Sequence, residues 1–257
     1  MARTHSRRRI HFLDELRGFC IILMVFYHAF YTVGYMFNVS FAQTLFDFFT
    51  PIESIFAGIF VFLCGMSCRL SRNNLRRGLL LAAVAVALTL VLWGGVQLGW
   101  LYNGAVIWFG ILHCLAACIL LYTLLYPTIR FIPPWLGLLL CTVLFAFCYH
   151  IPSGEGGYFG FDGLFRLYIP AAEANNPFLY PFGLCPVGAT GDYFPLLPWF
   201  FCFLGGAYAA MWGIPKWMNR SRAPFFSRIG RWSLWIYLAH QPVIYGLCLG
   251  ISYLLTV

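Results

Sequence analysis

The sequence is poor in charged residues: only 9% of its 257 residues are Asp, Glu, Lys or Arg, whereas 61% are hydrophobic. A water-soluble domain usually carries about 25% charged residues, so this composition excludes one and predicts a membrane protein. The sequence also lacks a glycine-rich phosphate-binding loop, a zinc-type spacing of Cys and His, and any low-complexity tract. The net charge of +8 would suit nucleic acid, but the positions of the basic residues argue against that partner.

The ten cysteines do not form a pattern typical of a disulfide framework. Nine of them lie within apolar segments, where cysteine behaves as a small apolar side chain, and only Cys185 lies in a long loop. We therefore expect neither disulfides nor a metal centre.

What the sequence has in abundance is long apolar segments. A bilayer core of ~30 Å is crossed by a helix of about 20 residues. We predict an all-α fold, a polytopic bundle of about seven transmembrane helices that forms a single integral-membrane domain over residues 1–257. The predicted spans are 17–37, 52–70, 78–98, 105–126, 133–150, 194–213 and 231–254.

The basic residues predict the orientation of this bundle. Of the 16 Lys and Arg residues, 14 lie in the N-terminal segment or in the connections on its side of the membrane. Arg17 lies at that same face, and only Arg166 lies opposite. Because basic residues concentrate on the cytoplasmic side, we expect a cytoplasmic N-terminus and an outer C-terminus.

The connection 151–193 is the one long loop, and we expect it to be extracytoplasmic. It is rich in glycine, proline and aromatic residues. Loops longer than about 12–15 residues are usually functional or disordered, and so many aromatics argue against disorder. Two interpretations remain open: a stiff cap over the bundle, or an outer rim for a substrate such as a sugar.

Three histidines fall inside the predicted spans. At 1.5 Å per helical residue, His28, His113 and His240 would lie roughly 16, 18 and 13 Å above the inner face. A single membrane histidine is often a hydrogen-bonding strut between helices. Three at one depth favour a functional site, because imidazole titrates near neutral pH and suits proton transfer.

A short polar motif, LDELRG, precedes the first span. Asp14 and Arg17 are spaced i,i+3 and can pair on a helix. Arg17 also lies eleven residues before His28, so the two side chains share a face about three turns apart. The motif is either an ordinary acidic helix start or an arginine that binds an anionic cofactor group beneath His28. We interpret Glu53 and His150 as interfacial and leave open whether they join the site.

The segments LDELRGFCIILMVFYH, FLCGMSCRLSRNNLRRG, WFGILHCLAACILL and IGRWSLWIYLAHQPV, in this order, resemble the heparan-alpha-glucosaminide N-acetyltransferase catalytic-domain family. A weaker similarity runs to the wider transmembrane acyltransferases. The resemblance covers nearly the whole chain and implies that an acyl group from cytosolic acetyl-CoA passes to a sugar amine or hydroxyl across the membrane.

The resemblance also assigns residues. It places Asp14 and Arg17 in the N-terminal motif, His28 at the polar first-span position, His113 in FGILH and His240 in the closing histidine motif. Lysosomal members carry a further histidine in the first outer loop, implicated in catalysis. Residues 31–51 contain none, so that role passes to His28 or is absent.

The leading hypothesis is therefore an integral-membrane acyltransferase with acetyl-CoA as donor and no metal. Arg17 with Asp14 would bind CoA, and His28 would act as general base or acyl carrier. His113 and His240 would orient the acceptor or donate to the oxyanion.

Two other classes compete with an enzyme. A proton-coupled small-solute transporter would use the same histidines as a relay, and a scaffold would need neither. The expected partners are membrane lipid, acyl-CoA and an extracytoplasmic glycan or small-molecule acceptor, with a homodimer left open. The expected location is the plasma membrane of a bacterium. The acceptor and the acyl chain are not determined by the sequence.

Overall fold

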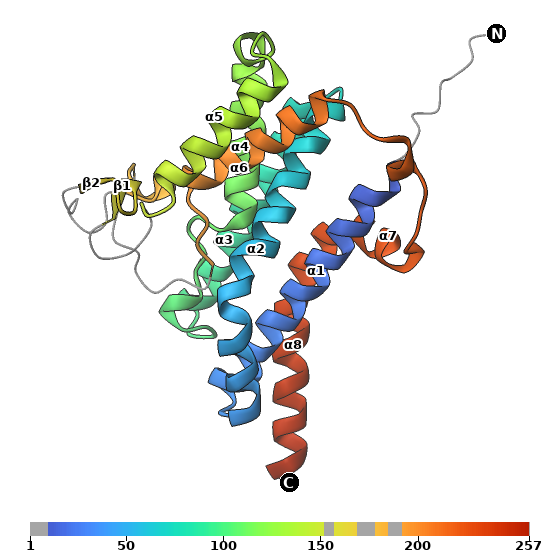
Figure 1. Cartoon of the computed structure of the whole chain (residues 1–257). Helices are drawn as coiled ribbons and strands as arrows, with labels where there is room; N and C mark the ends of the chain where they lie inside the picture. The colour runs from blue at the N-terminus through green and yellow to red at the C-terminus, as the bar shows by residue number, and fades with distance from the viewer. Residues whose placement is uncertain (1–9, 152–156, 169–177, 185–191, 257) are drawn as a thin grey trace. The chain divides into compact units, whose positions relative to one another are not determined.

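A computed structural model describes residues 10–151, 157–168, 178–184 and 192–256 (Figure 1). Cys185 and parts of the predicted loop 151–193 lie outside these residues. The fold is all-α, with 76% helix. The helices are α1 (His11–Tyr31), α2 (Ser40–Leu70), α3 (Asn74–Gln97), α4 (Ile111–Ile129), α5 (Pro134–Cys148), α6 (Leu196–Met211), α7 (Pro224–Arg231) and α8 (Ser233–Thr256).

Shorter elements connect these helices. A π-helical turn, Thr32–Met36, follows α1, and 3₁₀ turns cover Asn103–Ala105, Tyr180–Phe182 and Lys216–Asn219. Two strands, β1 (Tyr158–Phe161) and β2 (Phe165–Tyr168), form an antiparallel hairpin within the long connection.

Five helical stretches of the described chain are long and apolar enough to cross a membrane, as expected of a membrane protein. The helices α5 and α6 are also apolar but have only 15 and 16 residues. At 1.5 Å per residue they measure about 22–24 Å, less than a bilayer core of ~30 Å. A total of seven spans therefore stays a prediction. The five stretches are His11–Met36, Ser40–Leu70, Asn74–Gln97, Ile111–Ile129 and Ser233–Leu254.

Several helix boundaries differ from the predicted ones. The second helix begins at Ser40, not near residue 52. Its polar first turns are compatible with a helix because the Thr44 and Thr50 hydroxyls donate to the carbonyls of Ser40 and Phe46, four residues earlier. The fourth helix begins at Ile111, not near residue 105, because the preceding residues form turns.

The chain divides into two compact units. The first unit comprises Met1–Leu63 and Ile214–Val257, and thus holds α1, most of α2, α7 and α8. The second comprises Cys64–Gly213 and holds the end of α2, α3 to α6 and the hairpin. That residues 1–257 act as one integral-membrane domain stays a prediction.

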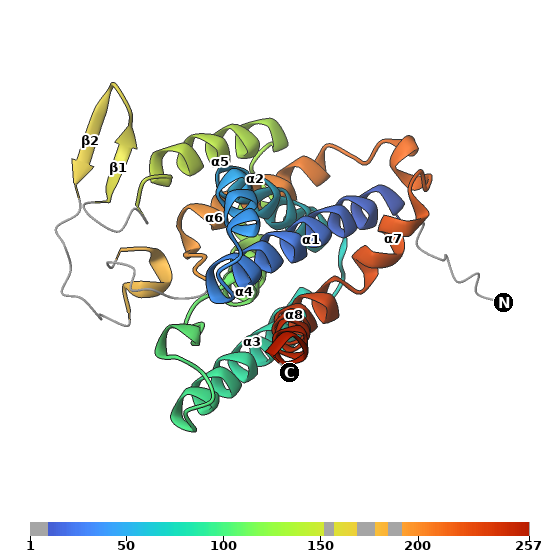
Figure 2. The same cartoon turned by 90° about the horizontal axis from the view of Figure 1, so that it is seen from below.

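In the first unit, α1 crosses α7 (Figure 2), and one glycine of each helix lies at the contact. A Cβ at Gly18 would lie 2.0 Å from the carbonyl oxygen of Phe226. One at Gly230 would lie 1.9 Å from the carbonyl oxygen of Asp14. Both contacts are with backbone, which cannot rotate away, so only glycine allows the two helices to approach this closely. The helix α8 contacts both α1 and α7.

The second unit has its core around α6. The side chain of Phe203 is fully buried and its ring contacts that of Tyr122 on α4 at 6.1 Å. A Cβ at Gly65 would lie 1.8 Å from the carbonyl oxygen of Phe203, so α2 also approaches α6 through a glycine. The remaining pairs are α3 with α4 and α5 with α6.

The hairpin packs on the end of α5. The ring of Phe147 stacks on that of Phe159, with 5.5 Å between the ring centroids. At the turn, the Asp162 carboxylate accepts from the Tyr158 hydroxyl at 2.5 Å and from Arg166 Nη2 at 2.9 Å. His150 Nε2 lies 3.2 Å from its other oxygen. The Tyr158 hydrogen bond, followed by Arg166 and His150, lowers the pKa of Asp162. A substrate-binding role of this loop stays a prediction.

Substituting either crossing glycine by alanine should destabilise the first unit. We expect Gly18→Ala and Gly230→Ala each to cost about 1–3 kcal/mol, as overpacked sites usually do. Thermal unfolding of the detergent-solubilised protein, followed by tryptophan fluorescence, measures the loss. Gly246→Ala on α8 is the matched control, since its Cβ would meet nothing within 4 Å. Equal melting temperatures for all three variants would contradict the crossing.

Acidification should loosen the hairpin through Asp162. The pKa of Asp162 is lower in the folded protein than in the unfolded chain. The ionised Asp162 carboxylate therefore stabilises the folded hairpin fully above the usual Asp pKa near 4. This stabilisation is lost as the pH falls through the pKa of the folded state. Hydrogen exchange of the hairpin amides, corrected for intrinsic rates, should show protection at about pH 5 that is lost at about pH 2.5. Asp162→Asn should show low protection at both values; pH-dependent protection in that variant would refute the assignment.

Candidate functional site

The first unit brings two of the predicted site histidines together. His28 on α1 and His240 on α8 have ring centroids 5.0 Å apart, with the ring planes tilted by 49°. His240 is buried, with 8% of its surface exposed. Residues that are 212 positions apart thus form one imidazole pair on two helices that are each long and apolar enough to span a membrane.

A hydrogen-bonded chain holds the His28 ring. The Thr32 hydroxyl donates to Gln241 Oε1 at 3.2 Å, and Gln241 Nε2 lies 3.3 Å from His28 Nδ1. Sequence reasoning missed both partners. Signals existed, because Thr32 follows His28 by four residues and so shares its helical face, and Gln241 adjoins His240.

The buried ring of His240 is held by its own helix. Its Nδ1 lies at 2.5 Å from the backbone carbonyl of Tyr237, three residues earlier. A carbonyl accepts hydrogen bonds but cannot donate them. This contact therefore fixes the orientation of the imidazole that faces His28.

The predicted ion pair of the N-terminal motif is present. Arg17 Nη1 lies 3.5 Å from Asp14 Oδ1, and both side chains are largely buried, with 21% and 14% exposed. Arg17 Nη2 also donates to the backbone carbonyl of Leu63 on α2 at 3.4 Å. The guanidinium thus has a defined position on the same helix as His28. Binding of an anionic cofactor there stays a prediction.

The third predicted histidine belongs to the second unit. His113 lies in the first turn of α4, where its Nδ1 accepts from the Gly110 N–H at 3.4 Å. Its Nε2 lies 3.2 Å from the Thr89 hydroxyl, which donates to the Ile107 carbonyl at 2.6 Å. Both ring nitrogens therefore contact groups at the start of α4, and a catalytic role of His113 stays a prediction.

The observed start of α4 affects the predicted depth of His113. That prediction counts the helical rise from residue 105, whereas the helix begins at Ile111. The count therefore does not apply to this residue. A shared depth for the three imidazoles stays a prediction, and the pair that the structure brings together is His28 with His240.

Glu53 and His150, which the sequence neither includes in the site nor excludes from it, lie in different units. His150 contacts Asp162 beside the hairpin of the second unit, as described above. Glu53 lies on α2 within the first unit. A direct role for either residue stays untested.

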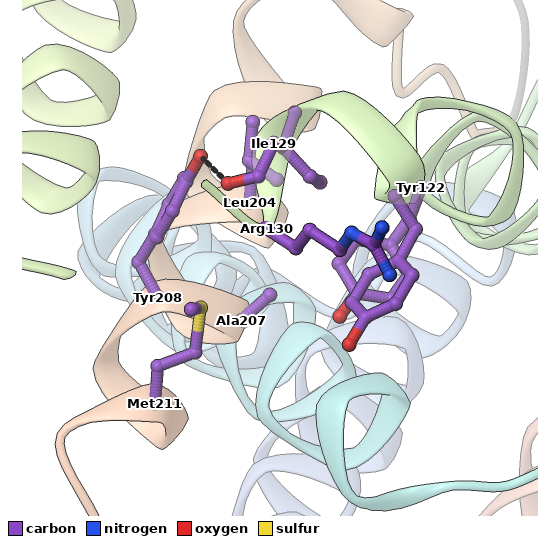
Figure 3. A pocket seen from close by; sticks show the side chains of 8 residues that line it. Tyr122, Ile129, Arg130, Leu204, Ala207, Tyr208 and Met211 are labelled. Atoms are coloured by element: carbon purple, nitrogen blue, oxygen red, sulfur yellow. Dashed lines mark hydrogen bonds between the residues drawn. The ribbon is translucent and has the colours of Figure 1, made fainter. Parts of the chain in front are cut away.

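A small pocket in the second unit lies between α4 and α6 (Figure 3). The Tyr208 hydroxyl donates to the Ile129 carbonyl at 3.0 Å on one side, and Tyr122 and Arg130 are among the other lining residues. The pocket has room for about one water molecule. It contains none of the predicted site residues and is too small for an acyl chain.

The chain is similar to one known protein family over most of its length. The family model described as heparan-alpha-glucosaminide N-acetyltransferase, catalytic, matches residues 9–242. The match includes Asp14, Arg17, His28, His113 and His240. No curated protein and no solved structure matches the chain. With its apolar helices and this match over most of its length, the chain belongs to the heparan-alpha-glucosaminide N-acetyltransferase catalytic family and is a membrane-embedded acyltransferase.

Proposed function

We propose that the chain transfers an acetyl or other acyl group from cytosolic acyl-CoA to an amine or hydroxyl of a sugar-type acceptor outside the cytoplasm. The observation that carries the proposal is the imidazole pair of His28 and His240, 5.0 Å apart on two apolar helices of an acyltransferase family member. Two titratable rings inside a membrane are costly to keep, which supports a functional role for them.

The hydrogen bonds of the two histidines support a different chemical role for each ring. Because the Tyr237 carbonyl can only accept, neutral His240 carries its proton on Nδ1 and its lone pair on Nε2. Gln241 uses its oxygen for the Thr32 hydroxyl, so its NH₂ group faces His28 Nδ1. Neutral His28 then accepts at Nδ1 and carries its proton on Nε2. One ring is thus prepared to take a proton and the other to donate a hydrogen bond.

This arrangement fits direct acyl transfer. His240 Nε2 takes the proton of the acceptor N–H or O–H while the acceptor atom forms a bond to the acyl carbonyl carbon. The carbon–sulfur bond breaks, and the CoA sulfur leaves and receives the proton. His28 Nε2–H donates to the carbonyl oxygen as negative charge develops on it. This proposal exchanges the roles predicted from the sequence, in which His28 is the general base and His240 orients the acceptor or donates to the oxyanion. The predicted alternative, in which His28 carries the acyl group, would require its Nε2 to lose this proton first.

The proposed path crosses the membrane from the cytosolic side. We infer seven spans, a cytoplasmic N-terminus and an outer C-terminus from the distribution of basic residues. Arg17 then lies near the cytosolic face, where its guanidinium suits a CoA phosphate. His28 lies eleven residues further along α1, about 16 Å deeper. In this scheme, His113 positions α4 through Thr89 and Gly110, and its predicted catalytic role would require it to leave these contacts.

Release of CoA tests the reaction. Purified protein in nanodiscs, given acetyl-CoA and an amine or hydroxyl acceptor, should release CoA thiol. His28→Ala and His240→Ala should each reduce the rate on the order of 100-fold, the usual minimum for lost acid–base catalysis. His11→Ala, at the start of the same helix α1, should leave the rate unchanged. Full activity in both site variants, or no release with a broad acceptor panel, would disprove the proposal.

The proton positions in the pair can be observed directly. In protein with ¹⁵N-labelled histidine, long-range proton–nitrogen correlation spectra near neutral pH should show His240 protonated on Nδ1 and His28 on Nε2. Assignment comes from the loss of one signal in His28→Gln and in His240→Gln. Gln241→Leu should remove the preference at His28 and leave His240 unchanged. A His240 ring protonated on Nε2 would contradict the proposed base.

A further inference from the structure

The segment between α6 and α8 carries a charged surface that contains none of the predicted site residues. Residues 214–232 contain five basic residues and no acidic one. All five side chains are exposed: Lys216, Arg220, Arg222, Arg228 and Arg231. Three large aromatic side chains beside them are exposed as well, namely Phe225 at 68%, Trp232 at 59% and Trp235 at 63%. We call these eight residues the basic–aromatic strip.

Part of the strip lies on the side of α7 that faces away from α1. Ser227 and Gly230 are buried on the side of α7 that crosses α1. At 100° per residue, Phe225, Arg228 and Trp232 project from the opposite side. One side of the helix is therefore occupied by α1, whereas the other presents two aromatic rings and the Arg228 guanidinium together.

The buried carboxylate of Glu15 holds the start of α7 against α1 through backbone and hydroxyl donors, and not through the arginine side chains of the strip. Glu15 on α1 is 7% exposed, and its Oε1 accepts from the Ser221 hydroxyl at 2.7 Å. The same oxygen accepts from the backbone N–H groups of Arg222 and Ala223 at 2.9 and 3.0 Å. It thus caps the start of α7 through backbone and hydroxyl donors. The arginine side chains of the strip remain exposed.

The chain itself places the strip at the level of a membrane surface. The helix α7 ends at Arg231, and α8, which is long and apolar enough to cross a membrane, begins at Ser233. A helix joined to a membrane span by one residue lies at the boundary between lipid and water. Aromatic and basic side chains together are typical of that boundary, where rings enter the acyl region and cations reach phosphates.

We propose that the basic–aromatic strip binds the phosphate groups of anionic lipids in the cytosolic leaflet. Arg228 and Arg231, one turn apart, contact the headgroups, while Phe225 and Trp232 insert beside them. A lipid surface fits better than a soluble anion because exposed indole and phenyl rings are unfavourable in water but stable at the interface. The inference is independent of acyl transfer, since it involves neither His28 nor His240.

Lipid titration of the full-length protein in neutral detergent tests this inference. Microscale thermophoresis with short-chain phosphatidylglycerol and, separately, phosphatidylcholine should show preferential binding of the anionic lipid. Arg228→Gln/Arg231→Gln should weaken phosphatidylglycerol binding on the order of tenfold, given the usual contribution of each basic residue near an anionic surface. Equal binding of both lipids would overturn the proposal.

A charge-matched variant and a salt titration complete the design. Arg72→Gln/Arg76→Gln removes two exposed arginines from the connection between α2 and α3 and should bind phosphatidylglycerol like the wild type. Raising the salt concentration should weaken binding by unmutated protein, which tests the charge contribution without any risk of misfolding. Insensitivity to salt contradicts the proposal. The proposal is also contradicted if the Arg228→Gln/Arg231→Gln variant loses acetyl-CoA binding while its phosphatidylglycerol binding is unchanged. The strip would then bind the phosphate of a soluble ligand.

Discussion

In the hydrocarbon core of a membrane there is no water to satisfy a polar side chain, so the protein must supply every hydrogen-bonding partner itself. The contacts around the candidate site follow from this constraint. His28 is held by Gln241 and Thr32, and His240 by a carbonyl of its own helix. These partners do more than satisfy the rings. They also hold each ring in a defined orientation, and the proposed tautomers rest on these contacts.

The same constraint explains how the helices approach one another. Between helices in lipid there is little hydrophobic driving force, so close backbone packing contributes much of the stability. Gly18 and Gly230 allow α1 and α7 to touch, and Gly65 does the same for α2 and α6. In the first unit the glycine contact and the Glu15 cap act together, because both hold α7 against the helix that bears Arg17 and His28. A short surface helix is thereby linked to the helix of the candidate site.

Much of the fold could be predicted from composition and pattern. Long apolar segments identify membrane helices reliably, because no other regular structure satisfies its backbone within a single segment in lipid. Boundaries were less predictable where polar residues continue a helix. The first turns of α2 contain Thr44, whose hydroxyl bonds to the backbone of its own helix, so polarity there does not mark a loop. The short helix α7 has too few residues to give an apolar run, and the hairpin depends on packing against Phe147 of another element.

The sequence by itself determined the class of protein, the approximate location of its apolar helices, the family and the five candidate site residues. Each of these depends on residue type and local spacing, which can be read along one chain. Tertiary structure decided which residues meet: His28 with His240, Gln241 with Thr32, and His113 with Thr89. Such partners lie far apart in sequence and on separate elements. Their contact depends on how helices pack and rotate against one another, which helical periodicity does not specify.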